Sequence, residues 1–291
     1  MDNRKIVCAN NNGMVVNFSD KFLPFLLADA DGLYGINFKV NMPDNTMTDG
    51  ATYQSSTAKK RNIVLTLKTK ANHRLGRYEL YQLFPQDMAG TLTYIEDGVE
   101  RKIDYIVESV TPDSEKNVRT ATVSLLCPSP FFKAANETTL TMAGWEADFE
   151  FIHEFLEEGE SFGHRVKERL KVIESTSGAK YIPIKVEIYA NGGVTNPTVT
   201  HVETGDFIKV GNTAHTLNMT AGDLLVITTG TNDKRVRLTH EGVTTEINEY
   251  LDEDSEFIQL QPGTNTIGYS AEAGDSNMTV SLSYTETYPG A

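Results

Sequence analysis

Alternating apolar and polar residues predict that strands dominate the chain. The alternation is clearest at Ile63–Leu67, where Ile63, Leu65 and Leu67 share one face of an extended segment. Asp97-Gly98 separates two further runs of this kind and is a hairpin signal. In the first half, strands are predicted at Gly35–Val40, Ile63–Leu67, Thr91–Tyr94, Lys102–Val107 and Thr120–Leu126, with a further antiparallel partner beginning at Val110.

One segment of the first half has helical spacing instead. The predicted helix runs from Arg74 to Phe84 and ends before Pro85, which cannot continue a helix. The apolar positions that keep the spacing are Leu75, Tyr78 and Leu83, with Tyr81 or Phe84. One amphipathic helix is enough to cover an exposed sheet face, so the first half is predicted to be mostly β with a single helix.

Between two of these strands lies a long polar segment, Asn41–Lys60, which has no periodicity. A structureless loop of that length inside a compact domain is uncommon and usually functional. Its end, Lys59-Lys60-Arg61, is basic. Two interpretations stay open: a solvated charged loop, or an arm that reaches a neighbouring subunit.

A rigid corner follows the last strand of the first half. Pro128 and Pro130 each remove a backbone donor and push the preceding residue toward extended geometry, so a central strand cannot continue through them. Phe131 and Phe132 make the corner too apolar for a free linker. The corner either ends one sheet and starts another, or joins two domains.

In the second half, strand signals recur about every ten residues with glycine turns between them, a pattern typical of a β-sandwich. Leu170–Glu174 is predicted as a strand, whereas residues 153–168 are ambiguous, and Trp145 is expected in a core. Further strands are predicted at Ile182–Tyr189, Thr198–Val202, Phe207–Val210, Leu224–Thr228, Arg235–Thr239, Phe257–Leu260, Asn265–Ser270 and Met278–Tyr284.

Charge divides the chain at the same corner. The 291 residues carry a formal net charge of −14, of which residues 1–133 contribute +1 and residues 134–291 contribute −15. This shift favours two domains, 1–133 and 134–291. Because an acidic surface repels phosphates, no nucleic-acid binding is expected.

Neither a membrane span nor a secretory signal is predicted. No apolar run approaches the ~20 residues that cross a bilayer, and the N-terminus lacks the apolar core of a signal peptide. Folding in a cytoplasm is therefore expected, and Cys8 and Cys127 are expected to be a reduced, buried pair.

Motifs that carry chemistry are scarce. His153–Glu157 begins like a zinc-protease helix but has Glu where the second His is needed. Asp252–Glu256 is the densest acidic cluster, and we interpret it as a solvated turn rather than a cation site. We predict no catalytic, cofactor-binding or metal-binding residues, no cofactor, and no enzyme activity.

In the order of these features, the chain resembles the distal tail protein (Dit) family of long-tailed, non-contractile bacteriophages that infect Gram-positive bacteria. The segments that carry the resemblance are Arg61–Leu67, Arg77–Phe84, Gly90–Tyr94, Arg101–Ile103, Ser124–Phe132, Gly205–Ile208 and Phe257–Ile267. Each segment alone is a weak signal, and their order and spacing together are fairly specific.

The resemblance implies a structural adaptor of the tail tip or baseplate. Residues 1–133 would form a homohexameric ring, with Asn41–Lys60 as the arm that embraces the neighbour. The ring would join the tail tube protein to the hub protein that carries tail-associated lysin activity. Residues 134–291 would form a peripheral, galectin-like or carbohydrate-module-like β-sandwich. The protein would belong to the virion and assemble in the host cytoplasm.

A second hypothesis is a carbohydrate-binding protein of the virion that acts through residues 134–291. A receptor-binding protein and a host-surface saccharide are the two partners that the resemblance offers for this half. The adaptor requires self-assembly of residues 1–133, whereas a lectin requires exposed aromatic side chains in the second half.

Overall fold

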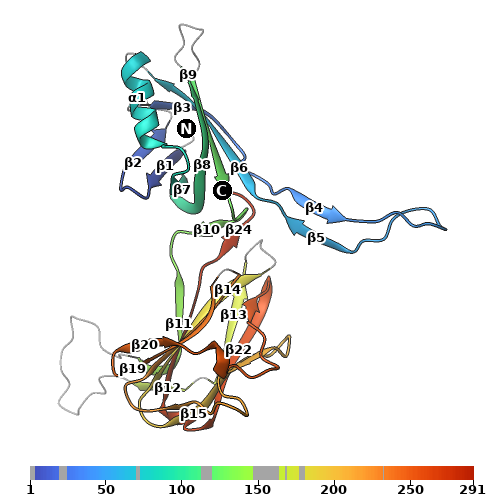
Figure 1. Cartoon of the computed structure of the whole chain (residues 1–291), viewed down its shortest axis with the longest axis vertical. Coiled ribbons are helices and arrows are strands. Elements are labelled where there is room, and N and C mark those ends of the chain that lie inside the picture. The colour runs from blue at the N-terminus through green and yellow to red at the C-terminus, as the bar shows by residue number, and fades with distance from the viewer. Residues whose placement is uncertain are drawn as a thin grey trace. The chain divides into compact units, whose positions relative to one another are not determined.

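The computed structural model describes residues 4–19, 25–69, 73–112, 120–146, 164–167, 169–176, 181–231 and 233–291. These residues are mainly strands in several antiparallel sheets, as predicted, and include one α-helix (Figure 1). The chain divides into two compact units. The first unit is Met1–Ala135 with Thr287–Ala291, and the second unit is Asn136–Glu286.

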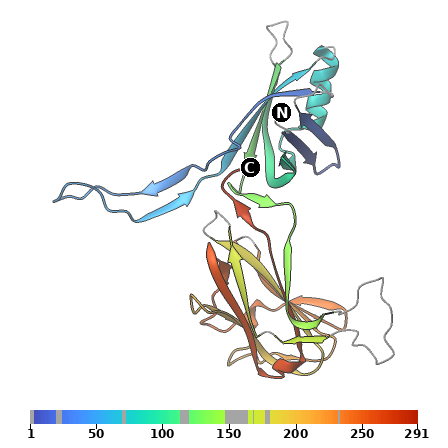
Figure 2. The same cartoon turned by 180° about the vertical axis from the view of Figure 1, so that it is seen from behind.

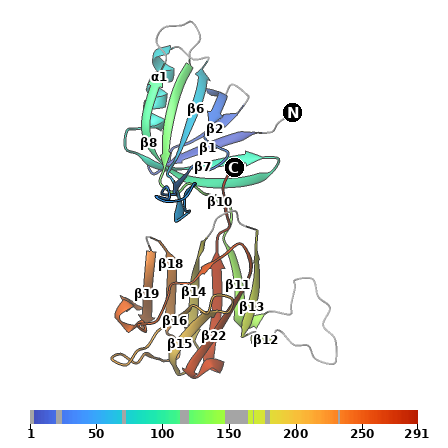
Figure 3. The same ribbon diagram turned by 90° about the vertical axis from the view of Figure 1, so that its right-hand side faces the viewer.

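The first unit is built on a closed run of strands. Its elements are β1 (Lys5–Asn10), β2 (Val15–Ser19), β3 (Phe25–Asp31), β4 (Phe38–Asn41), β5 (Ser55–Ala58), β6 (Arg61–Thr69), α1 (His73–Leu83), β7 (Ala89–Glu96), β8 (Val99–Pro112), β9 (Thr120–Cys127), β10 (Phe132–Ala134) and β24 (Thr287–Tyr288). The order is β24-β10-β8-β7-β1-β2-β3-β6-β9, and β9 pairs again with β8. That second pairing closes the strands into a barrel, seen from the side in Figure 3.

The barrel is filled by the inward residues of alternating strands. In β1 every second residue is buried, so that Ile6 and Cys8 point inward. Cys8 and Cys127 are both free and buried. Burial raises the pKa of both thiols, that of Cys127 to about 12, so neither is ionised at neutral pH.

The helix α1 forms where the sequence predicts it, but its buried face differs from the prediction. Leu80, Leu83 and Phe84 are buried, and the Phe84 ring lies 6.1 Å from that of Phe18. Tyr78 and Tyr81, which we placed on the apolar face, are exposed. The spacing from Leu80 to Leu83 and Phe84 already completes one helical face, so the tyrosines occupy the other.

The polar segment Asn41–Lys60 is not structureless. Its two ends belong to β4 and β5, which form a separate two-stranded antiparallel sheet. This hairpin extends away from the barrel of the first unit (Figures 1 and 2). The projecting arm of the prediction is therefore a paired hairpin, whose pairing was not predicted because the small residues of β5 give no hydrophobic signal.

The second unit is a β-sandwich. Its strands are β11 (Thr138–Glu146), β12 (His164–Lys167), β13 (Leu170–Ser175), β14 (Ile182–Ala190), β15 (Val194–His201), β16 (Phe207–Lys209), β17 (Asn218–Met219), β18 (Leu224–Gly230), β19 (Asp233–His240), β20 (Val243–Glu246), β21 (Gln259–Leu260), β22 (Gly263–Ala273) and β23 (Met278–Tyr284). Two 3-10 turns, Asn248–Tyr250 and Asp275–Asn277, complete it.

Two sheets make the sandwich. One runs β12-β11-β23-β14-β18-β19-β20, with β21 beside β14, and the other runs β13-β22-β15-β16, with β17 beside β15. Side chains of both sheets, such as Val186 and Val199, belong to one buried apolar cluster. The predicted strands of this half, including Leu170–Glu174, are found within four residues of their predicted ends.

The C-terminus differs from the predicted domain limits. We predicted domains at 1–133 and 134–291, whereas the units separate between Ala135 and Asn136. The last five residues return to the first unit because β24 pairs with β10, with Tyr288 opposite Phe132. Among the described residues, no helix is long and apolar enough to cross a membrane.

Candidate assembly site

The hairpin β4–β5 carries an apolar stripe on one face. Phe38 lies opposite Ala58 and Val40 opposite Ser56, so both large side chains point to the same side. Met42, directly after β4, is the next large apolar residue of the hairpin. These three side chains are 52%, 51% and 50% exposed, respectively. An isolated two-stranded hairpin with large apolar side chains in water is marginally stable, so this stripe is suited to being covered by a partner.

The far end of the hairpin is held by polar contacts. The Asn45 amide donates to the Gly50 carbonyl at 3.0 Å, and the Thr52 amide donates to the Pro43 carbonyl at 3.1 Å. The Thr52 hydroxyl donates to the Asn45 side-chain oxygen at 2.7 Å. These bonds keep the hairpin paired to its end, so it projects as an ordered arm.

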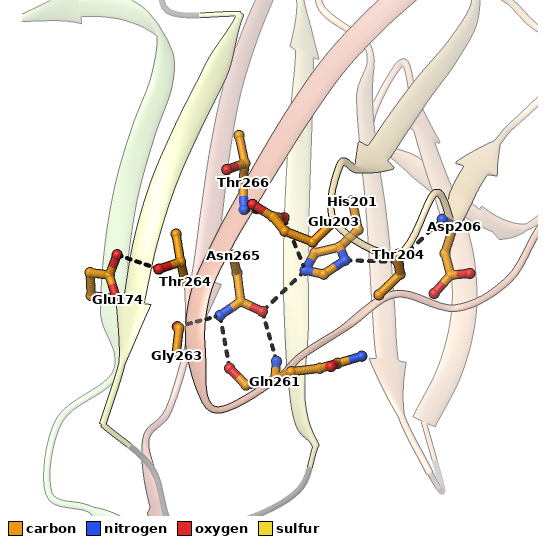
Figure 4. Close-up of polar contacts among 10 residues, drawn as sticks. All are labelled: Glu174, His201, Glu203, Thr204, Asp206, Gln261, Gly263, Thr264, Asn265 and Thr266. Carbon is orange, nitrogen blue, oxygen red and sulfur yellow. Dashed lines mark hydrogen bonds and ion pairs between the residues drawn. The ribbon is translucent and has the colours of Figure 1, made fainter.

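The second unit contains a buried polar junction between two turns, drawn in Figure 4. His201 ends β15, and Asn265 lies near the start of β22; both are buried. The imidazole Nε2 lies 3.1 Å from the Asn265 Oδ1, and Nδ1 lies 2.7 Å from the Thr204 hydroxyl. Because Asn265 Oδ1 also accepts the Gln261 amide at 2.7 Å, His201 donates from Nε2 and accepts at Nδ1 when neutral.

Asn265 uses its whole amide group in this junction. Its Nδ2 donates to the carbonyls of Gln261 and Gly263 at 2.8 and 2.9 Å. Thr204 Oγ1 in turn accepts the Asp206 amide at 3.2 Å. The turn after β15 and the turn before β22 are therefore fixed to one another through side chains.

Carboxylates border the junction. Glu203 Oε2 accepts the Thr266 amide at 2.7 Å and lies 3.7 Å from His201 Nε2. Hydrogen bonding by the Thr266 side chain, and then by its backbone amide, holds the pKa of Glu203 below its ordinary value. Glu174 accepts the Thr264 hydroxyl at 2.8 Å on the neighbouring strand. Both imidazole nitrogens of His201 are occupied by protein groups, which makes the junction a structural lock between turns.

The other segments weighed for chemistry give no metal or catalytic cluster in the part of the chain that the structure describes. Asp252 accepts the amide of Asp254 within the acidic segment, as expected of a solvated turn. Within the described residues, no three His, Cys, Asp or Glu side chains are arranged to hold a metal ion. His153–Glu157 and the Trp145 side chain lie outside what the structure describes.

Two family models match the chain. Residues 17–127 match the phage tail protein RIFT-related domain, and residues 177–288 match the C-terminal domain of the siphovirus-type tail component. Together the two matches span well over half of the chain. The buried junction lies within the second match, and the hairpin lies within the first.

Solved structures are similar over nearly the full length. The crystal structure of the SPP1 Dit (gp 19.1) protein, described as a paradigm of the hub adsorption apparatus in Gram-positive infecting phages, is 14% identical with a TM-score of 0.67. The match covers 97% of this chain and 98% of that one. Chains of the phage P2 baseplate in its activated conformation, with Ca and with Sr, are each 10% identical with a TM-score of 0.49 and cover 98% and 97% of this chain. Each match covers 98% of the baseplate chain. No curated protein matches the sequence.

The fold and both family matches define a structural component of a phage tail, which is part of the virion, and not an enzyme. The chain belongs to the siphovirus distal tail protein family. The resemblance drawn from the sequence motifs is thereby confirmed.

Proposed function

We propose that this chain is the ring-forming adaptor at the end of a phage tail. The first unit forms a homohexameric ring between the tail tube protein and a hub protein with tail-associated lysin activity. The second unit lies at the periphery of that ring. The host is a Gram-positive bacterium, in whose cytoplasm the tail assembles. The description of the SPP1 protein as part of a hub adsorption apparatus supports this function.

The observation that carries the proposal is the apolar stripe of the β4–β5 hairpin. Fully burying a Phe, Val or Met side chain stabilises a contact by roughly 1.5–3 kcal/mol. Phe38, Val40 and Met42 are each about half exposed, so each has roughly 1 kcal/mol left to gain on a neighbour. Three such residues supply about 3 kcal/mol, or about 100-fold in the association constant of each subunit contact.

The test compares substitutions of the apolar stripe with substitutions of the opposite face of β4. Phe38→Ser, Val40→Ser and Met42→Ser together remove the stripe. Lys39→Ser and Asn41→Ser change the other face of β4 and serve as the matched control. Light scattering over a concentration series measures the mass of each protein, and electron microscopy shows whether rings form.

We expect the wild-type chain and the control to form a ring at concentrations where the stripe variant stays monomeric. Hub and tube partners are added if the wild-type chain alone does not close, because such a ring can need a partner surface. A stripe variant that assembles as readily as the control contradicts the role of the hairpin.

The alternative function, saccharide binding by the second unit, has one observation in its favour. Tyr189 is exposed on β14, in a row with Thr279 and Leu224 of the neighbouring strands. Its exposed ring combines an apolar body with a polar hydroxyl, which is the kind of side chain that the saccharide-binding hypothesis requires. A glycan array probed with the wild-type chain and with Tyr189→Ala tests it, and binding that depends on Tyr189 would support this function.

A further inference from the structure

Arg61 is a buried charge whose partners come from three separate parts of the first unit. It is the first residue of β6 and is 6% exposed. Its Nη1 donates to the Gly32 carbonyl at 2.6 Å, its Nε to the Pro130 carbonyl at 2.8 Å, and its Nη2 to the Pro289 carbonyl. The guanidinium carbon lies 5.1 Å from the centroid of the Phe132 ring.

These three carbonyls hold a charge that has no carboxylate partner among the described residues. A buried charge destabilises the fold unless it is well hydrogen-bonded. Hydrogen bonds from an ionised donor are stronger than those between neutral groups, so three of them can hold this charge. The planar guanidinium presents its donors in a fixed fork, which a lysine cannot imitate. Loss of one carbonyl therefore leaves a buried N–H group unpaired and weakens the position of the whole side chain.

Each bound segment has its own place in the molecule. Gly32 lies in the turn that leads from β3 to the hairpin, which begins at Phe38. Pro130 lies in the corner just before the chain leaves the first unit after Ala135. Pro289 follows the point at which the chain returns, at Thr287. Arg61 thus contacts the segment that leads into the hairpin, here called the root of the arm. It also contacts both chain segments that connect the two units, at Pro130 on the way out and at Pro289 on the return.

The returning segment has further anchors of its own. The guanidinium of Arg101 lies 3.5 Å from the centroid of the Tyr288 ring, a close cation–π contact. Thr287 and Tyr288 pair with Lys133 and Phe132 of β10. The Ala291 amide donates to the Leu33 carbonyl at 3.1 Å, which is a second route from this segment to the arm root.

We propose that Arg61 is a positioning residue that couples the root of the β4–β5 arm to the two chain passages toward the second unit. Release of the returning segment then loosens the arm root, and a well-seated segment holds the arm in place. The coupling is a property of one chain and does not depend on the ring. In the proposed ring it links the state of the peripheral unit to the subunit contact.

Hydrogen exchange of the full chain, followed by mass spectrometry below the concentration of assembly, tests this coupling. Tyr288→Ala releases the returning segment and leaves Arg61 and the hairpin unchanged. The readout is exchange at residues 33–41 and at the Lys59 amide, which donates to the Asn37 carbonyl at 2.8 Å. We expect exchange there to accelerate about tenfold, which corresponds to a local opening whose free energy is lower by about 1.4 kcal/mol.

The decisive comparison repeats the substitution in an Arg61→Lys background. If Arg61 carries the coupling, Arg61→Lys alone accelerates exchange at the arm root, and Tyr288→Ala adds no further acceleration. If the effect of Tyr288→Ala persists undiminished, the route is the Ala291–Leu33 contact and the proposal is overturned. It is equally overturned if Tyr288→Ala leaves the arm root unchanged.

Controls separate this result from general destabilisation. Tyr189→Ala changes an exposed tyrosine of the second unit and should leave the arm root unaffected. Exchange in β18 and β23 shows that the second unit remains folded. If Arg61→Lys does not fold, Arg101→Gln is used in its place. Arg101→Gln must then accelerate hydrogen exchange as Tyr288→Ala does, both at the arm root and at Phe131–Phe132. Unchanged exchange at either place contradicts the coupling. Because the measurement is made on single chains, failure of ring assembly cannot produce either result.

Discussion

Replacing Asn265 with alanine should selectively destabilise the second unit. The side chain is fully buried and takes part in four hydrogen bonds, to the Gln261 amide, the His201 imidazole and the carbonyls of Gln261 and Gly263. Gln261 and Gly263 are exposed, so water replaces part of what they lose. His201 is buried, and its Nε2 would keep only the Glu203 carboxylate at 3.7 Å, which is too far for a hydrogen bond.

The magnitude follows from this difference. The three bonds to the exposed turn contribute together roughly 2 kcal/mol, since each net bond is worth about 1 kcal/mol and water recovers a part. An unpaired buried imidazole N–H costs about 1–3 kcal/mol more. We therefore expect Asn265→Ala to lower the free energy of unfolding of the second unit by about 3–5 kcal/mol.

Urea denaturation followed by tryptophan fluorescence measures this loss. Trp145 is the only tryptophan of the chain and lies in the second unit, so its emission reports that unit. With a slope of about 2 kcal/mol per molar urea, the expected loss lowers the midpoint by roughly 1.5–2.5 M.

The matched control is Asn191→Ala. Asn191 is exposed and donates to the Asn277 carbonyl and the Thr279 hydroxyl, so its loss should cost less than about 1 kcal/mol. An Asn265→Ala midpoint no lower than that of Asn191→Ala would refute the reasoning, because the junction would then be open to water.

Two further predictions concern one turn and one ion pair. Gly32→Ala should cost at least about 3 kcal/mol in thermal unfolding, because the residue has a φ of +80° and a Cβ there would lie 2.1 Å from the Asn62 carbonyl. Gly35→Ala, at a φ of +71° with open space around it, should cost only about 1 kcal/mol. Equal losses of stability in the two variants contradict the steric argument. The hydrogen bond from His240 Nδ1 to Asp223, at 2.6 Å, and the charge of that carboxylate raise the pKa of His240 above 6.5. The stabilisation from this ion pair is complete below pH 6.5 and is lost as the pH rises through the pKa of His240 in the folded protein, so the urea midpoint should fall between pH 6 and 9. His240→Gln should remove this fall. A fall that persists in His240→Gln contradicts the assignment of the pH dependence to His240.

Most elements of the fold could be predicted because they obey local rules. The strands of the second unit have clean alternation and glycine turns, and Pro85 marks the end of α1. The arm was harder: Phe38 and Val40 alternate, but β5 pairs with them through Ser56 and Ala58, which give no hydrophobic signal. Two strand residues, Thr287 and Tyr288, are too few for any periodicity to show that the chain returns to β10.

The two polar centres could not be predicted, for a different reason. Arg61 is held by backbone carbonyls, and a carbonyl is present at every position whatever the side chain. His201 and Asn265 are 64 residues apart and meet only because β15 and β22 pair. The sequence shows that each belongs to a turn, but only the strand order brings the turns together.

The proposed role of the arm also restricts how copies of this chain can associate. The stripe of Phe38, Val40 and Met42 lies on a projecting hairpin, and in the proposed ring it packs on a different part of the next copy. Such a contact is head-to-tail, and it leaves one arm and one receiving surface free until a ring closes or a filament grows. The concentration series therefore separates the outcomes: a closed ring gives a mass that reaches a plateau at six chains, whereas an open contact gives a mass that keeps rising. A plateau at two chains would contradict the head-to-tail contact, because it would require the stripe to pair with itself.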